Sequence, residues 1–138
     1  MGLCSSGGFF RLLVVGIMLI AILVGGCSHI DKGTLSQEAK QFFNQGNYGA
    51  ALGKYEQLIA NYPAVEDRVL FEMGIVYAYP KNAQKDYQKS LDCFQKIVKD
   101  HPDSEYRYDS QMMILQIHNM IIKDQKIAAQ QAALETSR

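Results

Sequence analysis

Histidine and cysteine are the residue types in this chain that could bind a metal ion or act as a nucleophile. The three histidines, at positions 29, 101 and 118, are far apart, and neither they nor the cysteines come at metal-ligand spacing. Cys93 is a single thiol next to Phe94, and a reactive thiol would need a positive neighbourhood that the sequence does not show. We therefore predict no metal site and an inert, half-buried Cys93.

Acidic residues form two short clusters, Glu66-Asp67 and Asp103 with Glu105. Both stand where helices are expected to begin, and negative charge is stabilising there. That role is favoured over catalysis by paired carboxylates, so we predict no catalytic residue among them.

The motifs of the common enzyme classes do not occur in this sequence. The chain has no Gly-x-Ser-x-Gly, Walker or His-Glu-x-x-His motif, and Gly46, Gly49 and Gly53 are spaced as a turn followed by helix-packing glycines. Its 14 basic and 14 acidic residues leave no basic excess to attract nucleic acid. We predict no cofactor, no small-molecule substrate and no nucleic-acid partner, and an enzyme is the least favoured function.

Residues 1–26 have the layout of a signal peptide that ends before Cys27. Arg11 and the terminal amine supply positive charge, Leu12–Val24 is an uninterrupted apolar run, and two glycines precede the cysteine. A retained transmembrane helix is the alternative, but spanning a bilayer takes about 20 apolar residues, and this run is shorter. The pattern predicts that residues 1–26 are removed.

Val24-Gly25-Gly26-Cys27 resembles the lipobox of bacterial lipoproteins. By that resemblance the small residues admit the backbone to a peptidase, and the Cys27 thiol accepts a diacylglyceryl group. The new amino terminus is usually acylated too, which matters because one acyl chain gives only marginal membrane binding. An unlipidated cysteine is the alternative. Ser28 stands where inner-membrane lipoproteins often carry Asp, so the resemblance implies a lipid anchor on the periplasmic face of the outer membrane.

The rest of the chain is predicted to be all-α, because apolar residues recur at helical spacing and no alternating β-type run occurs. Residues 27–34 are expected to be a polar tether, residues 35–123 a helical domain, and residues 124–138 a helical or frayed tail. Asp103-Ser104 is expected to cap the last helix. That helix carries a methionine-rich stretch from Met112 to Met120, for which packing in the core is favoured over partner binding.

The helical domain contains an internal repeat. Pro63 and Pro102 each close a pair of apolar stripes, and the offset between these prolines is the same as that between Tyr55 and Phe94. Repeats of this length built from helix pairs are typical of solenoids. We therefore expect Tyr55 and Phe94 to be buried at equivalent positions of two helical hairpins.

Several motifs in these halves resemble tetratricopeptide repeats. Gly46-Asn47-Tyr48 looks like the turn of the first copy, Met73–Tyr77 resembles the family's Leu-Gly-x-x-Tyr, and Asp86–Leu91 resembles its Asp-Tyr-x-x-Ala-Ile. The second copy carries about four extra residues around Pro80. The resemblance implies about two and a half helix–turn–helix units, with Gly74 placed where two helices approach closely.

The resemblance to this family also implies a binding face, because its members line a groove with the first helix of each hairpin. Carried over residue by residue, the predicted partner-binding residues are Lys40, Phe43, Asn44, Arg68, Phe71, Ile75 and Tyr79, with Ala78 beside them. An aromatic residue on such a face is a plausible binding hot spot. The alternative for Phe71 and Tyr79 is packing against a third hairpin, and the sequence leaves both open.

A narrower resemblance concerns the junctions Tyr62-Pro63 and His101–Tyr106, which look like those of the BamD-like outer-membrane lipoproteins. Those proteins combine a lipobox with tetratricopeptide hairpins and act as scaffolds in outer-membrane protein assembly. The resemblance implies a non-enzymatic scaffold that binds another envelope protein or peptide. A pilotin-like subunit of a type IV pilus or secretion apparatus is the alternative, since fold alone does not separate the two.

Overall fold

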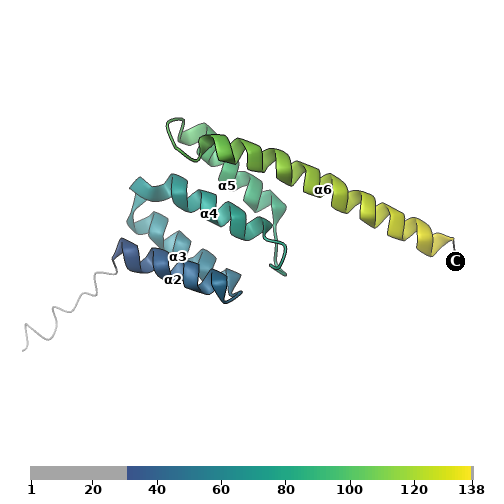
Figure 1. Ribbon diagram of the computed structural model, residues 1–138, viewed down its shortest axis with the longest axis horizontal. Coiled ribbons are helices and arrows are strands. Elements are labelled where there is room, and N and C mark those ends of the chain that lie inside the picture. Colours follow the sequence, from purple (N-terminus) through teal and green to yellow (C-terminus); the bar gives the residue numbers. More distant parts are fainter. Residues whose placement is uncertain (1–30, 138) are drawn as a thin grey trace, which may run out of the picture. The chain divides into compact units, whose positions relative to one another are not determined.

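The computed structural model describes residues 31–137, and all regular structure among them is helical (Figure 1). The α-helices are α2 (Lys32–Asn44), α3 (Tyr48–Asn61), α4 (Glu66–Ala78), α5 (Tyr87–Asp100) and α6 (Arg107–Thr136), and a 3-10 turn η1 (Pro63–Val65) precedes α4. The predicted signal peptide and Cys27 lie outside the described residues. Within residues 31–137, no helix combines the length and the apolar character needed to cross a membrane.

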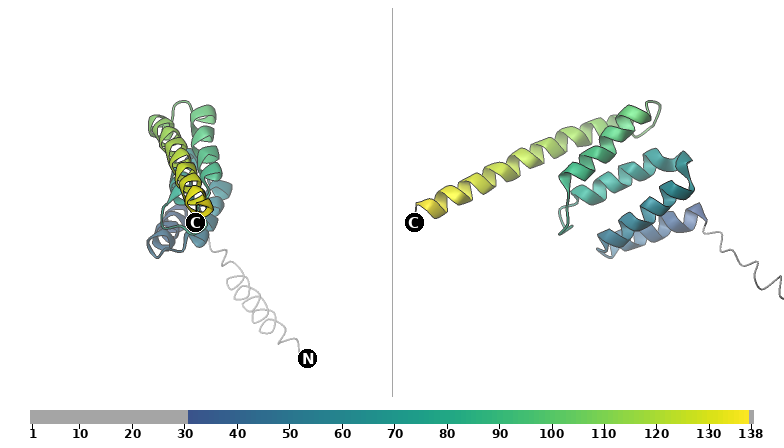
Figure 2. Two further views of the ribbon diagram at one scale, coloured as in Figure 1. Left: turned by 90° about the vertical axis from the view of Figure 1, so that its right-hand side faces the viewer. Right: turned by 180° about the vertical axis from the view of Figure 1, so that it is seen from behind.

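The helices form two stacked hairpins and a final long helix. α2 packs on α3, α4 packs on α5, and α6 packs on α5, so the extensive contacts join helices that follow one another in the chain. Figures 1 and 2 show the α2–α3 hairpin beside the α4–α5 hairpin, with α6 running along α5 and projecting past it. The predicted all-α fold of tetratricopeptide-like hairpins is confirmed.

The repeat is visible in the helix lengths. The first helices of the hairpins, α2 and α4, both have 13 residues, and the second helices, α3 and α5, both have 14 residues. The hairpins differ in the loop between their helices, which covers 45–47 in the first and 79–86 in the second. The second loop is therefore longer by five positions, close to the four extra residues expected from the sequence.

Asn82 stabilises this longer loop from inside. Its side chain is buried, its Nδ2 donates to the Val76 carbonyl at 3.0 Å, and its Oδ1 accepts from the Gln84 backbone N–H at 3.0 Å. A buried amide with both ends bonded compensates for its loss of hydration. The loop therefore has a fixed path that leads into the N-terminus of α5, where the Asp86 side chain accepts from the Lys89 backbone N–H at 3.0 Å.

The core confirms the predicted burial of Tyr55 and Phe94 and the close helix approach at Gly74. Tyr55 and Phe94 are both buried, at equivalent places in α3 and α5. A Cβ atom added to Gly74 would lie 2.6 Å from Cζ of Phe94, closer than real Cβ atoms come to a neighbour. The buried Ser90 hydroxyl donates to the Gly74 carbonyl at 2.6 Å. Gly74 thus lets α4 and α5 approach closely, which offsets its low helix propensity.

Three local expectations are wrong. α2 begins at Lys32, inside the predicted tether. The sequence misplaced this start because residues 32–34 are exposed and show no apolar pattern. α6 begins at Arg107 without a side-chain cap. The Ser104 Oγ accepts from the Tyr106 backbone N–H at 3.1 Å, just before the helix, and its hydroxyl donates to Asp67 at 2.6 Å. Gly49 and Gly53 do not serve packing, since a Cβ at either would meet nothing within 4 Å.

α6 is much longer than the hairpin helices. Its first half packs on α5 through the buried Ser110 and Ile117, and Met113 and Met120 also contact the core whereas Met112 is 41% exposed. From Ile122 to Ser137 every side chain is exposed. The tail predicted to be helical or frayed is therefore a continuous, solvated extension of α6.

Candidate protein-binding groove

A small hollow lies where α2, α3 and α4 meet. It has a volume of about 170 Å³ and is lined by Phe43 of α2, Tyr55 of α3, and Glu72, Ile75 and Val76 of α4. Phe43 and Ile75, both predicted to bind a partner, line it from neighbouring first helices of the two hairpins. We call this hollow the α2–α4 groove.

Glu72 provides the polar side of the α2–α4 groove. The Tyr55 hydroxyl donates to Glu72 Oε2, and Lys40 Nζ lies 3.8 Å from Glu72 Oε1. Burial of Tyr55 and its hydrogen bond to Glu72 raise the pKa of the phenol, so it stays a neutral donor at physiological pH. The Lys40 side chain is 59% exposed, and its ammonium group is thus available to an approaching chain.

Three aromatic rings pack together next to the α2–α4 groove. The Phe43 ring centroid lies 5.6 Å from that of Tyr48 and 5.0 Å from that of Tyr79, and the Tyr48 and Tyr79 centroids are 5.5 Å apart. The edge-on and tilted arrangements are those that aromatic pairs favour. Tyr79, a predicted binding residue, therefore packs against the first hairpin as a half-buried ring.

Phe71 packs in a different direction from Ile75. Its ring centroid lies 5.4 Å from that of Phe94 on α5 and 5.2 Å from that of Tyr106, just before α6. The sequence left open whether Phe71 packs against a third helical unit. Its contact with Tyr106, at the start of the unit formed by α6, is packing of that kind. Arg68, one turn earlier, is half-buried, and its Nε is buried without a hydrogen-bond partner among the described residues.

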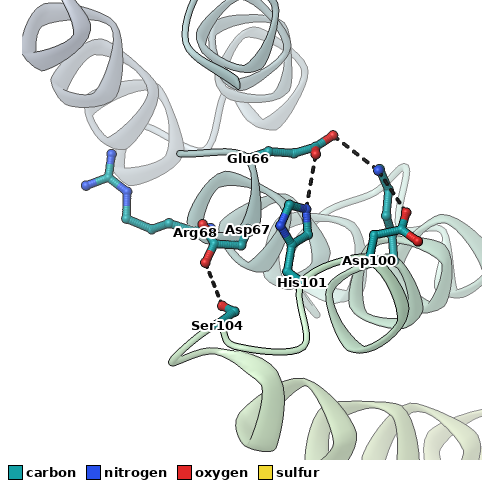
Figure 3. Close-up of polar contacts among 7 residues, drawn as sticks. Glu66, Asp67, Arg68, Asp100, His101 and Ser104 are labelled. Atoms are coloured by element: carbon teal, nitrogen blue, oxygen red, sulfur yellow. Dashed lines mark hydrogen bonds and ion pairs between the residues drawn. The ribbon is translucent and has the colours of Figure 1, made fainter. Parts of the chain in front are cut away.

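A polar network joins the start of α4 to the end of α5 (Figure 3). Glu66 Oε1 lies 3.3 Å from Lys96 Nζ, and Glu66 Oε2 lies 3.1 Å from His101 Nε2. Lys96 Nζ also reaches Asp100 Oδ2 at 3.1 Å. His101 is the C-cap of α5. Glu66 thus links α4 to Lys96 and His101 at the end of α5, while the Lys96–Asp100 pair lies within α5.

Asp67 extends the polar contacts to the turn before α6. Its Oδ2 accepts from the Ser104 hydroxyl at 2.6 Å, and its Oδ1 accepts from the Arg68 backbone N–H at 2.8 Å. Burial alone would raise the pKa of Asp67, but these hydrogen bonds outweigh it and lower the pKa below its ordinary value. Figure 3 shows the Arg68 guanidinium directed away from this contact.

Cys93 is buried more deeply than the sequence indicated. The side chain is 8% exposed, and burial, together with the nearby Asp92, raises the thiol pKa to about 11. The thiol is thus protonated at neutral pH, the state that does not attack electrophiles. Among residues 31–137, no three His, Cys, Asp or Glu side chains lie where they could hold a metal ion.

The structure brings some of the predicted binding residues together and separates others. Lys40, Phe43, Ile75 and Tyr79 lie in or beside the α2–α4 groove. Phe71 faces the third helical unit, and Asn44 is the exposed last residue of α2.

Three residues that line the groove were not among the predicted binding residues: the buried Tyr55 and Val76, and Glu72, whose charge matters most for binding. A signal was present, because Glu72 precedes Ile75 by three positions and so lies on the same face of α4.

Comparison with known proteins identifies the repeats. The tetratricopeptide repeat family matches residues 35–64 and 68–104. The first match covers most of α2 and all of α3, and the second covers most of α4, all of α5 and part of the turn that follows. No curated protein and no solved structure matches the chain.

Proposed function

We propose that this chain is a non-enzymatic scaffold that binds a segment of another protein in the α2–α4 groove, because residues 35–64 and 68–104 match the tetratricopeptide repeat family. The observation that carries this proposal is the convergence of Phe43 and Ile75, from two successive repeats, on one hollow with Lys40 and Glu72 at its side. Stacked repeats form extended concave surfaces that other proteins use for binding. The apolar and charged groups together suit a peptide with an apolar anchor.

The size of the hollow favours a peptide over a small metabolite. Small-molecule sites usually enclose about 300–1,000 Å³, whereas this one has about 170 Å³. A space of that size suits a single side chain of a partner, and the rest of the partner would lie along the exposed rim. The Lys40 ammonium group favours an acidic residue next to the anchor.

The groove is tested by placing a charge in it. We expect Ile75→Glu in the full-length, tagged chain to lose the proteins that the wild type captures from solubilised membranes, because the buried anchor would meet an unpaired carboxylate. The readout is mass spectrometry of the captured proteins, with circular dichroism to confirm that the variant stays helical.

Ile59→Glu is the matched control. Ile59 is also half-buried, but it lies on α3 and does not line the groove. It should keep the captured proteins despite a similar loss of stability. The same captured set for both variants, or none for the wild type, would contradict the proposed groove.

The membrane attachment is a further part of the proposal and rests on Val24-Gly25-Gly26-Cys27. We propose that lipid on Cys27 holds the scaffold to the periplasmic face of the outer membrane. Cys27→Ala should leave the precursor uncut and without acyl groups, because the thiol that accepts the lipid is gone. Intact-mass spectrometry of the full chain gives the answer, and an acylated mature form of the variant would disprove the lipid anchor.

Two envelope machines fit such a scaffold. The junction sequences that resemble BamD-like lipoproteins favour a role in outer-membrane protein assembly, and a pilotin-like role in a pilus or secretion apparatus is the alternative. The identity of the proteins that the wild type captures and Ile75→Glu loses distinguishes between these two roles. Barrel-assembly components would support the first role, and pilus or secretion components the second.

A further inference from the structure

The last helix has an apolar face that no described residue covers. Four large apolar side chains of α6 are exposed there: Tyr108 at 70%, Met112 at 41%, Leu115 at 58% and Ile122 at 49%. We call these four residues the outer stripe. Single exposed apolar residues are ordinary, but four large ones on one face of a helix suit an interaction surface. The exposed Asn119 lies on the same face, between Leu115 and Ile122.

The helical repeat places the outer stripe opposite the packed face. At about 100° per residue, Met112, Leu115 and Ile122 fall within about 40° of Tyr108 around the helix axis. Ser110 and Ile117, which are buried against the rest of the fold, fall on the opposite side. α6 therefore packs on the hairpins with one face and carries the outer stripe on the opposite, exposed face.

The position of α6 in the stack explains why this face is open. Each earlier helix is covered by the next helix in the chain, whereas α6 is the last helix that the structure describes and contacts only α5 extensively. A helical repeat array that ends on an uncovered apolar face requires a cap. The outer stripe lies on a different helix from the α2–α4 groove, so its occupant is separate from the partner proposed above.

We propose that a second copy of this chain covers the outer stripe, with the two α6 helices packed antiparallel about a twofold axis at Leu115. Leu115 is the midpoint of the stripe, since Tyr108 and Ile122 lie seven positions to either side of it. The twofold pairing sets Leu115 against Leu115 of the second copy and Tyr108 against Ile122 of the second copy. A self-complementary patch of this kind is what a twofold dimer interface requires.

Charges beside the outer stripe select this orientation. Asp109 and Lys123 are exposed and project from the same flank of α6, about 100° and 60° around the axis from Tyr108. With Leu115 on the twofold axis, Asp109 of one copy lies within about two residues, or roughly 3 Å along the axis, of Lys123 of the other. In a parallel pairing this flank of one copy would lie against the opposite flank of the other, so these charges would not meet.

The contact is tested in the full-length chain with single cysteines. Leu115→Cys should form a disulfide-linked dimer under mild oxidation, because the two sulfur atoms would meet at the twofold axis. Leu134→Cys is the matched control, since Leu134 is also exposed (68%) but lies outside the outer stripe. The unsubstituted chain measures the background from Cys4, Cys27 and the buried Cys93.

The register is tested by co-expressing two differently tagged copies. Tyr108→Cys in one copy and Ile122→Cys in the other should give a mixed dimer, whereas Ile122→Cys alone should not give its own dimer. Asp109→Lys should reduce the Leu115→Cys dimer, and adding Lys123→Asp should restore it.

The proposal is overturned if Leu115→Cys stays monomeric, if Leu134→Cys links equally well, or if the charge exchange restores nothing. A monomeric result with the outer stripe covered by a different protein would also overturn it.

Discussion

At the scale of single residues, glycines in two helices of this fold meet opposite surroundings. A Cβ on Gly74 would collide with the Phe94 ring, whereas a Cβ on Gly53 would meet nothing within 4 Å. We expect Gly74→Ala to lower the free energy of unfolding by about 1–3 kcal/mol, the cost of overpacking a core. We expect Gly53→Ala to raise it by about 0.5–1 kcal/mol, because alanine is the better helix former.

This pair of variants is measured by urea unfolding followed by circular dichroism. Each glycine serves as the control for the other, since the same methyl group is added to a helix in both cases. Equal stabilisation by both would show that α4 and α5 do not approach closely at Gly74.

The two glycines also show what a sequence can indicate at this scale. Gly74 was predicted at a close approach because it stands in a motif, Met73–Tyr77, whose packing logic is general. Gly49 and Gly53 have the helical spacing of packing glycines, yet no neighbour lies near them. Spacing alone reports which face a residue is on, and it does not report what is opposite that face.

At the scale of elements, the turn before α6 is held to α4 by the hydrogen bond between Ser104 and Asp67. The pKa of Asp67 is lowered in the fold, so ionised Asp67 stabilises the folded state above its unfolded pKa of about 3.9. That stability is lost as the pH falls through the lower, folded-state pKa. Removing the hydroxyl should therefore cost more stability at neutral pH than in strong acid, where the hydrogen bond that Ser104 Oγ accepts from the Tyr106 backbone N–H (3.1 Å) is still lost.

Ser104→Ala tests this linkage. We expect the variant to unfold at lower urea concentration than the wild type at pH 7, and the difference between them to shrink as the pH falls from about 4 to about 2. In an Asp67→Asn background the effect of Ser104→Ala should no longer change with pH in this range. A difference that is constant with pH in the wild-type background would show that the Ser104 hydroxyl does not favour the ionised Asp67.

Most helix boundaries could be predicted, and the exceptions share a physical cause. Turns at Gly46 and Pro63 were predictable because a left-handed residue (Gly46, φ +76°) and a proline each end a helix locally. The starts of α2 and α6 were misplaced. The first turn of α2 is exposed and has no apolar pattern, and the Ser104 side chain is engaged by Asp67 from another helix. Tertiary contacts of that kind are invisible to local patterns.

At the scale of the whole described unit, the candidate site was only half predictable. The resemblance to tetratricopeptide repeats placed Phe43, Ile75 and Tyr79 on one binding face. The direction of the Phe71 ring depends on where Tyr106 and α6 lie. The sequence of α4 alone does not reveal that position. The outer stripe was missed for a related reason, since a helix with two apolar faces has the composition of a buried helix until its neighbours are known.

The order of contacts also bears on how quickly this chain can fold. Its extensive helix–helix contacts all join neighbours in the sequence, so each hairpin closes only a short loop before its apolar faces meet. Folding rates rise as contacts become more local, and helical domains of low contact order fold in microseconds to milliseconds. The α2–α3 hairpin needs nothing from α6 to begin forming. Folding can therefore start at either hairpin and spread along the array. α6 can pack once α5 has formed the surface that it contacts.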